Sequence, residues 1–148
     1  PVLTVAHNKT SPLTASDFLG AAIWVIAVGC TSLADRQLAC FKGRPENRGK
    51  SCREGLWRYS RHPNYFFEWL RWWAYAGLAV GSTYWWVPVA APLVMLFFLL
   101  KVTGIPPTEA QALASRGDDY REYQRTTSAF VPWFPKKEAE RDESDRSG

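Results

Sequence analysis

Residues 55–68 read GLWRYSRHPNYFFE and decide how the rest of the chain is interpreted. Arginines, aromatic rings, a His-Pro-Asn-Tyr turn and a carboxylate lie together there, directly before an apolar stretch. Pro63 fits the first turn of a helix, where its missing N–H leaves no hydrogen bond unmade. We therefore predict that a helix begins at Pro63 and continues through the apolar residues 66–81.

The predicted helix gathers its polar side chains on one narrow face, since successive residues are about 100° apart. These side chains are Asn64, Glu68, Arg71 and Tyr75. On a helix that is otherwise as apolar as a membrane span, polar groups must face protein or a water-filled cavity. The stripe thus predicts the wall of a buried polar site, and a structural ion pair of Glu68 with Arg71 is the alternative interpretation.

Three segments are candidates for crossing a membrane. Residues 18–34 and residues 84–100 each contain seventeen residues without a charge, which is the lower limit for a span. Residues 66–81 are apolar apart from Glu68 and Arg71. A soluble helical bundle is the alternative, but three such segments among 148 residues favour an all-helical membrane bundle. Aromatic residues make up 15% of the chain, as suits the aromatic belts at bilayer surfaces.

Lys and Arg side chains concentrate in residues 36–62 and 101–148, which hold sixteen of the eighteen. By the positive-inside rule, we expect both stretches on the cytoplasmic side of a multi-pass protein. The chain lacks a nucleic-acid-binding motif, which argues against nucleic acid as a partner. We divide the chain into a polar connector (1–16), a membrane domain (17–135) and a charged tail (136–148), which we expect to be disordered.

The segment after residue 104 predicts two short helices. Thr108 with Gln111 has the spacing of a capping box, as does Asp119 with Glu122. The first helix should end near Gly117. For Glu109 and Arg116, the expected roles are those of a helix-cap charge and a solvated surface residue.

The motif resembles the C-terminal domain of the steroid 5-alpha-reductase family and its bacterial relatives. Its core, Arg-His-x-Asn-Tyr followed by an acidic residue, is shared with sterol reductases of the lamin-B-receptor type. The resemblance also covers residues 34–37, 41–42, 104–107, 120–123 and 130–133. It implies an integral-membrane, all-helical reductase that binds NADPH. Many relatives carry Gly before the acidic residue, where this chain has Phe67.

The resemblance also implies cofactor contacts. Asp35 and Lys42 match positions that reach the cofactor in the family, and Tyr123 matches an element of the family pattern. Within the motif, the guanidinium of Arg61 suits phosphate, and Asn64 offers two donors and an acceptor. The predicted cofactor-binding residues are Asp35, Lys42, Trp57, Arg61, His62, Asn64, Tyr65, Glu68 and Tyr123. Helix capping, packing, interfacial anchoring and lipid-headgroup contact are the structural alternatives for these residues.

We assign no catalytic residue, because in the family the acid that polarises the substrate belongs to upstream helices. The chain begins at Pro1 and its only methionine is Met95. We therefore expect upstream transmembrane helices as partners, beside membrane lipids and a lipophilic substrate. The cysteines show neither a C-x-x-C pair nor a His at zinc spacing, so we expect no metal and no disulfide.

Three functions remain open. The first is NADPH-dependent reduction of a carbon–carbon double bond in a steroid-like or isoprenoid substrate. The second is an S-adenosylmethionine-dependent membrane methyltransferase of the isoprenylcysteine carboxyl type, which shares the Arg-His-Pro-x-Tyr turn; Asn64 with Glu68 and residues 104–107 favour the reductase. The third is a non-enzymatic membrane scaffold. No Gly-x-Gly-x-x-Gly occurs, so a nucleotide would not be bound by a Rossmann turn.

Overall fold

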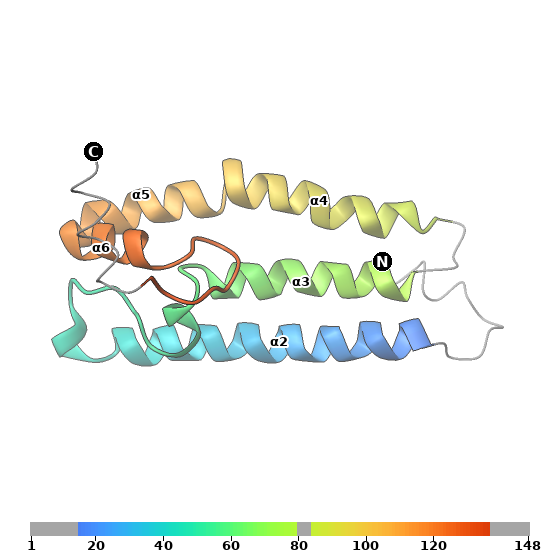
Figure 1. Ribbon diagram of the computed structural model, residues 1–148, viewed down its shortest axis with the longest axis horizontal. Coiled ribbons are helices and arrows are strands. Elements are labelled where there is room, and N and C mark those ends of the chain that lie inside the picture. Colours follow the sequence, from blue (N-terminus) through green and yellow to red (C-terminus); the bar gives the residue numbers. More distant parts are fainter. Residues whose placement is uncertain (1–14, 80–83, 137–148) are drawn as a thin grey trace.

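The computed structural model describes residues 15–79 and 84–136, and this part of the chain is helical and has no strand. Three long helices lie side by side, and the short elements gather at one end (Figure 1). The elements are α2 (Ala15–Lys42), η1 (Pro45–Asn47), η2 (Gly55–Arg58), α3 (Pro63–Leu78), α4 (Trp86–Lys101), α5 (Ile105–Arg116) and α6 (Asp118–Thr126). The predicted all-helical class is confirmed for this part. The predicted connector and disordered tail lie almost wholly outside the described residues.

Helix α3 begins at Pro63, as predicted, and packs between α2 and α4 (Figure 1). Small residues allow α2 to approach α3 closely, since Ala27, Ala34 and Ala74 are fully buried. At Gly20, an added Cβ would come within 2.9 Å of the Leu78 side chain. Close contact at small residues is the usual way in which helices associate in a membrane.

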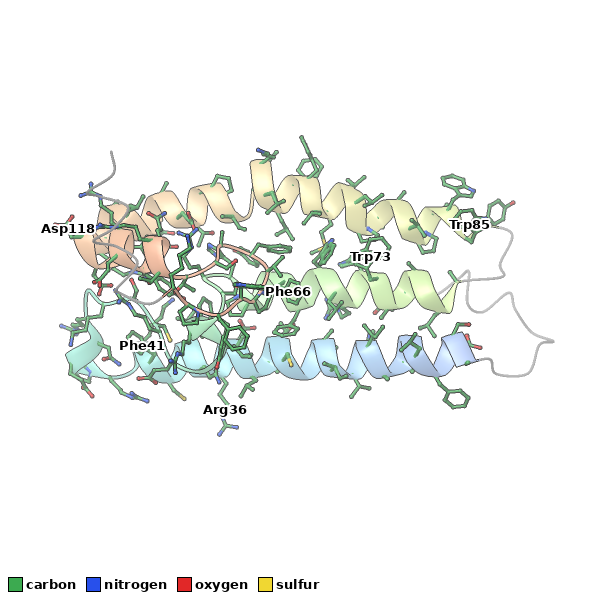
Figure 2. All side chains as sticks on the ribbon, viewed as in Figure 1. Arg36, Phe41, Phe66, Trp73, Trp85 and Asp118 are labelled. Atoms are coloured by element: carbon green, nitrogen blue, oxygen red, sulfur yellow. The ribbon has the colours of Figure 1, made fainter. Side chains whose placement is uncertain are left out.

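Helix α4 is largely exposed, but its two prolines, Pro88 and Pro92, are buried. They are four residues apart and so share one face. Trp69 of α3 donates its indole N–H to the carbonyl of Pro92 at 3.0 Å. The indole N–H of Trp73, one turn further along α3, is buried and has no hydrogen-bond partner among the described residues. Figure 2 shows Trp73 between α3 and α4.

Two helical segments are long and apolar enough to cross a membrane. They are Ala15–Lys42, which contains an 18-residue stretch with a mean hydropathy of 1.7, and Trp86–Arg116, which contains one with a mean hydropathy of 2.0. Helix α3 has 16 residues and does not reach the length of a span by itself. The prediction of three spans is therefore not confirmed, since two segments of the described chain are long and apolar enough. Exposed aromatic rings occur at residues 84–86, where Trp85 lies at one end of the bundle (Figure 2), and at residues 133 and 134 after α6.

Both predicted capping boxes are wrong. Helix α5 begins three residues before Thr108, whose hydroxyl donates to the carbonyl of Gly104 at 2.7 Å instead of capping the helix. Helix α6 begins at Asp118, and the carboxylate of Asp119 accepts a hydrogen bond from the backbone of Ser51 at 2.6 Å. The predicted end near Gly117 is confirmed, since this glycine, with a φ of +56°, separates the two helices.

Candidate functional site

A cavity of about 200 Å³, which we call the motif cavity, lies where the end of α2 meets the start of α3 and the two tail helices, α5 and α6. Seven of the nine predicted cofactor-binding residues line it. They are Lys42, Trp57, Arg61, His62, Asn64, Tyr65 and Tyr123. Thr108, Ala112 and Arg116 of α5 and Tyr120 of α6 complete much of the opposite wall. The structure therefore brings together residues from three regions of the sequence that are far apart.

The two remaining predicted residues, Asp35 and Glu68, lie outside the lining of this cavity. Asp35 accepts a hydrogen bond from the side-chain amide of Asn64 at 3.3 Å and so orients a residue that does line it. Glu68 forms an ion pair with Arg71 on the same helix. This is the structural pair foreseen as the alternative interpretation, and a cofactor contact of Glu68 stays a prediction.

Glu109 of α5 does not line the motif cavity, but its carboxylate contacts several residues that do. Its carboxylate lies 3.1 Å from Arg61 Nη2 and 3.3 Å from His62 Nε2. It also accepts hydrogen bonds from the Tyr120 hydroxyl at 3.4 Å and the Gln124 amide at 2.9 Å. The expectation of a helix-cap charge for Glu109 is wrong, because this carboxylate ties the motif to both tail helices.

The neighbours of Glu109 determine its charge state. The cationic guanidinium of Arg61 and the hydrogen bond with His62 both favour the ionised form of this carboxyl group. Glu109 is thus held as a carboxylate. Its position fixes the side chains of Arg61 and His62, whose other faces line the cavity.

The rings of His62 and Tyr65 stack on each other and form an aromatic platform in the cavity wall. They stack with a centroid distance of 5.4 Å and an interplanar angle of 5°. His62 is almost fully buried, and its backbone N–H is bound by the Ser60 hydroxyl at 3.1 Å. Such a platform, with a polar residue at its edge in Asn64, suits the face of an aromatic or heterocyclic ring.

Tyr123 fixes the backbone of the motif. Its hydroxyl donates to the carbonyl of Trp57 and lies 3.3 Å from that of Ser60. Burial raises the pKa of this phenol above its ordinary value, so it remains a donor. The Tyr123 ring lines the cavity while its polar end is used by the protein itself. Its predicted contact with a cofactor is therefore restricted to the ring.

The chain segment after α6 also holds the motif in place. The backbone N–H of Arg61 donates to the carbonyl of Ser128 at 2.8 Å, and the Ser60 hydroxyl donates to the carbonyl of Phe130 at 2.8 Å. Arg53, which precedes the motif, contacts Asp119 and Glu122 of α6 at 3.4 and 3.5 Å. The motif is thus clamped between α2 and residues 119–130.

All formally charged residues that line the motif cavity are cations: Lys42, Arg61 and Arg116. A second space of about 270 Å³, the basic cavity, shares Leu38, Lys42, Cys52 and Arg116 with it. The basic cavity adds Arg48 and Lys50 from the loop after α2. Neither lining contains a carboxylate among the described residues. The two adjoining cavities can therefore bind an elongated ligand that carries several negative charges.

The sequence matches the family described as "Protein of unknown function (DUF1295)" over residues 1–127. The chain belongs to the DUF1295 family. DUF1295 is associated with steroid 5-alpha-reductase-like membrane proteins. No curated protein and no solved structure matches this DUF1295 chain.

Three features of this DUF1295 site were not anticipated from sequence: the role of Glu109, the contribution of Arg116 and the basic cavity. Arg116 lies over the Tyr120 ring at 5.3 Å and lines both cavities, although a solvated role was expected. Arg48 and Lys50 belong to a loop rich in Gly, Pro and Asn, without a recognisable motif. The excess of Lys and Arg in residues 36–62 was the available signal, and it was interpreted only as topology.

Proposed function

We propose that this chain is the cofactor-binding part of a membrane reductase that uses NADPH to reduce a carbon–carbon double bond in a lipophilic substrate, steroid-like or isoprenoid. The observation that carries the proposal is that every formally charged residue lining the two adjoining cavities beside the Arg-His-Pro-Asn-Tyr motif is Lys or Arg. NADPH carries phosphate groups at two places along an extended molecule. Arginine and lysine are the side chains that bind phosphate most strongly.

The size of the cavities supports an extended ligand. Pockets that enclose a small molecule usually measure about 300–1,000 Å³, so the motif cavity alone, at about 200 Å³, is small for a dinucleotide. The basic cavity continues it across four shared residues. We assign the ring platform of His62 and Tyr65 to one end of the ligand and Arg48 with Lys50 to the phosphorylated end.

The same charges argue against S-adenosylmethionine. That cofactor carries a sulfonium cation and no phosphate, so Lys42, Arg61 and Arg116 would repel its reactive centre. Glu109 lies within reach of Arg61 and His62 but is not part of the lining. The methyltransferase is therefore the weaker alternative for this site.

The division of labour follows from these contacts. When bound, NADPH supplies a hydride, and the chain's residues supply binding and orientation. Lys42, Arg61 and Arg116 would bind one phosphorylated part of the cofactor and Arg48 with Lys50 the other, while Glu109 keeps Arg61 in place. Asn64, itself held by Asp35, would bind a polar edge of the cofactor. We place this end of the bundle on the cytoplasmic side and the lipophilic substrate on the membrane side, with the catalytic acid on upstream helices.

The test is a binding titration of the full-length protein in detergent with NADPH, NADH and S-adenosylmethionine. We expect NADPH to bind and S-adenosylmethionine not to bind. Lys42→Gln should weaken NADPH binding roughly tenfold, or about 1.4 kcal/mol. Arg36→Gln is the matched control, since Arg36 lies on the same helix, loses the same charge and points away from the bundle (Figure 2).

Each contrary outcome has a distinct meaning. Binding of S-adenosylmethionine without NADPH would replace the reductase with the methyltransferase. Binding of neither ligand would favour the scaffold. Equal effects of Lys42→Gln and Arg36→Gln on NADPH affinity would show that the two cavities are not where the phosphates bind.

A further inference from the structure

We propose that a third cavity, formed by the segment after α6, binds the headgroup of an anionic phospholipid. This tail cavity measures about 320 Å³. Its principal residues are Arg61, Arg125, Ser128, Trp133, Phe134 and Lys136. The proposal depends on the membrane placement of the bundle, and the tail cavity shares only Arg61 with the motif cavity.

The lining of the tail cavity attracts anions. Arg61, Arg125 and Lys136 contribute three cations, and no acidic side chain lines the cavity within the described residues. Arg61 is nine-tenths buried, and its Nε has no hydrogen-bond partner in the described chain. A buried donor without an acceptor is costly, so a phosphate oxygen within reach of this side chain would be stabilising.

The tail cavity lies at the level where α3 becomes apolar. The Phe130 ring packs on Phe66 and Trp69, in the first two turns of α3, with centroid distances of 5.6 and 5.7 Å. The segment that forms the cavity is therefore attached to the start of a helix whose following side chains are suited to lipid. This is the depth at which phosphate headgroups meet a membrane protein.

Two aromatic rings at the mouth of the cavity indicate a lipid rather than a free anion. Trp133 is 70% exposed and Phe134 is 78% exposed. Both are held in place, since the Trp133 N–H donates to the Tyr59 carbonyl at 2.9 Å and the Phe134 ring meets the Tyr59 ring at 6.0 Å. Fixed, exposed rings beside cations match a phospholipid, whose acyl chain covers the rings while its phosphate meets the cations.

The experiment is native mass spectrometry of the full-length protein in detergent, with phosphatidylglycerol and phosphatidylcholine as probes. We expect retention of phosphatidylglycerol over phosphatidylcholine by at least tenfold. The double variant Arg125→Gln/Lys136→Gln should lose that preference. The control Arg36→Gln/Arg121→Gln removes two exposed arginines outside the tail cavity and should keep it. If the double variant is unstable, Lys136→Glu, at an exposed position, replaces it.

Three results would overturn the proposal. The first is equal retention of the two lipids by the unmodified protein. The second is an equal loss of preference in the control variant, which would indicate only the net charge. The third is full displacement of phosphatidylglycerol by an equal concentration of inorganic phosphate, which would make the tail cavity a site for free anions.

Discussion

Single residues of the motif cavity were predictable to the extent that they are neighbours in the sequence. Trp57, Arg61, His62, Asn64 and Tyr65 lie within nine positions, and one turn with the start of one helix brings them together. Glu109 is separated from His62 by 47 residues. A carboxylate after two prolines has nothing in its local sequence to distinguish it from a surface charge, so its role depends on tertiary structure alone.

Cys52 provides a prediction at this scale, because it lines both the motif cavity and the basic cavity. Its side chain is buried, and burial raises the pKa of its thiol above the ordinary value of 9.0. The thiolate is the reactive form, so alkylation of Cys52 should be slow near neutral pH and accelerate as the pH rises towards its pKa. NADPH should slow it further by filling the space beside it.

Cys40 is the internal control, since it is an exposed cysteine near the end of α2 and lines neither cavity. Peptide mass spectrometry after timed alkylation measures both sites in one sample. Protection of Cys40 to the same degree, or an unchanged rate at Cys52 with NADPH present, would contradict occupation of the two cavities by the cofactor.

Among the helices, α3 shows what periodicity predicts and what it leaves open. The helical period placed Asn64, Glu68, Arg71 and Tyr75 on one face, and the structure partners all four: Asn64 with Asp35, Glu68 with Arg71, and Tyr75 with the indole N–H of Trp24 at 3.1 Å. Only Asn64 lines the cavity. A period of 3.6 residues identifies the residues that share a face, but the packing of α2 decides what that face meets.

The contact between α3 and α4 gives the prediction at this scale. Trp69→Phe removes the donor that binds the Pro92 carbonyl and should destabilise the protein by about 1–3 kcal/mol. Trp73→Phe removes a buried N–H that has no partner in the described chain, so it should destabilise the protein less than Trp69→Phe does. Both changes replace an indole with a phenyl ring.

Thermal unfolding in detergent compares the two variants directly. Because the loss of volume is the same, the difference between them isolates the hydrogen bond. Equal destabilisation by Trp69→Phe and Trp73→Phe would show that packing alone determines the contribution of these side chains.

At the scale of the whole molecule, the distribution of charge and the arrangement of the helices agree. The loop after α2 and the helices α5 and α6 lie at the same end of the bundle, and residues 84–86 lie at the other (Figure 1). The helical class was predictable because long apolar segments have few alternatives in a membrane. The number of spans was not predictable from the sequence. Helix α3 carries a polar stripe and, at 16 residues, is shorter than a span.

Cysteine labelling in sealed vesicles tests this arrangement. In a Cys40→Ser background, Lys50→Cys and Arg121→Cys should react with a membrane-impermeant reagent from one side, and Tyr84→Cys from the other. All three positions are exposed in the structure. Labelling of Lys50→Cys and Arg121→Cys from opposite faces of the membrane would contradict the proposed topology.

The clamp on the motif has a consequence for biosynthesis. Residues 57–61 are held by Tyr123, Ser128 and Phe130, which are translated more than sixty residues later. When translation has reached the end of α4, the apolar helices have been made, but the groups that hold the motif in place have not. Since chains fold from the N-terminus during synthesis, we expect the motif cavity to take its final shape only after the apolar helices have been made. A chain truncated before residue 123 would contain the apolar helices but would lack the groups that hold residues 57–61 in place.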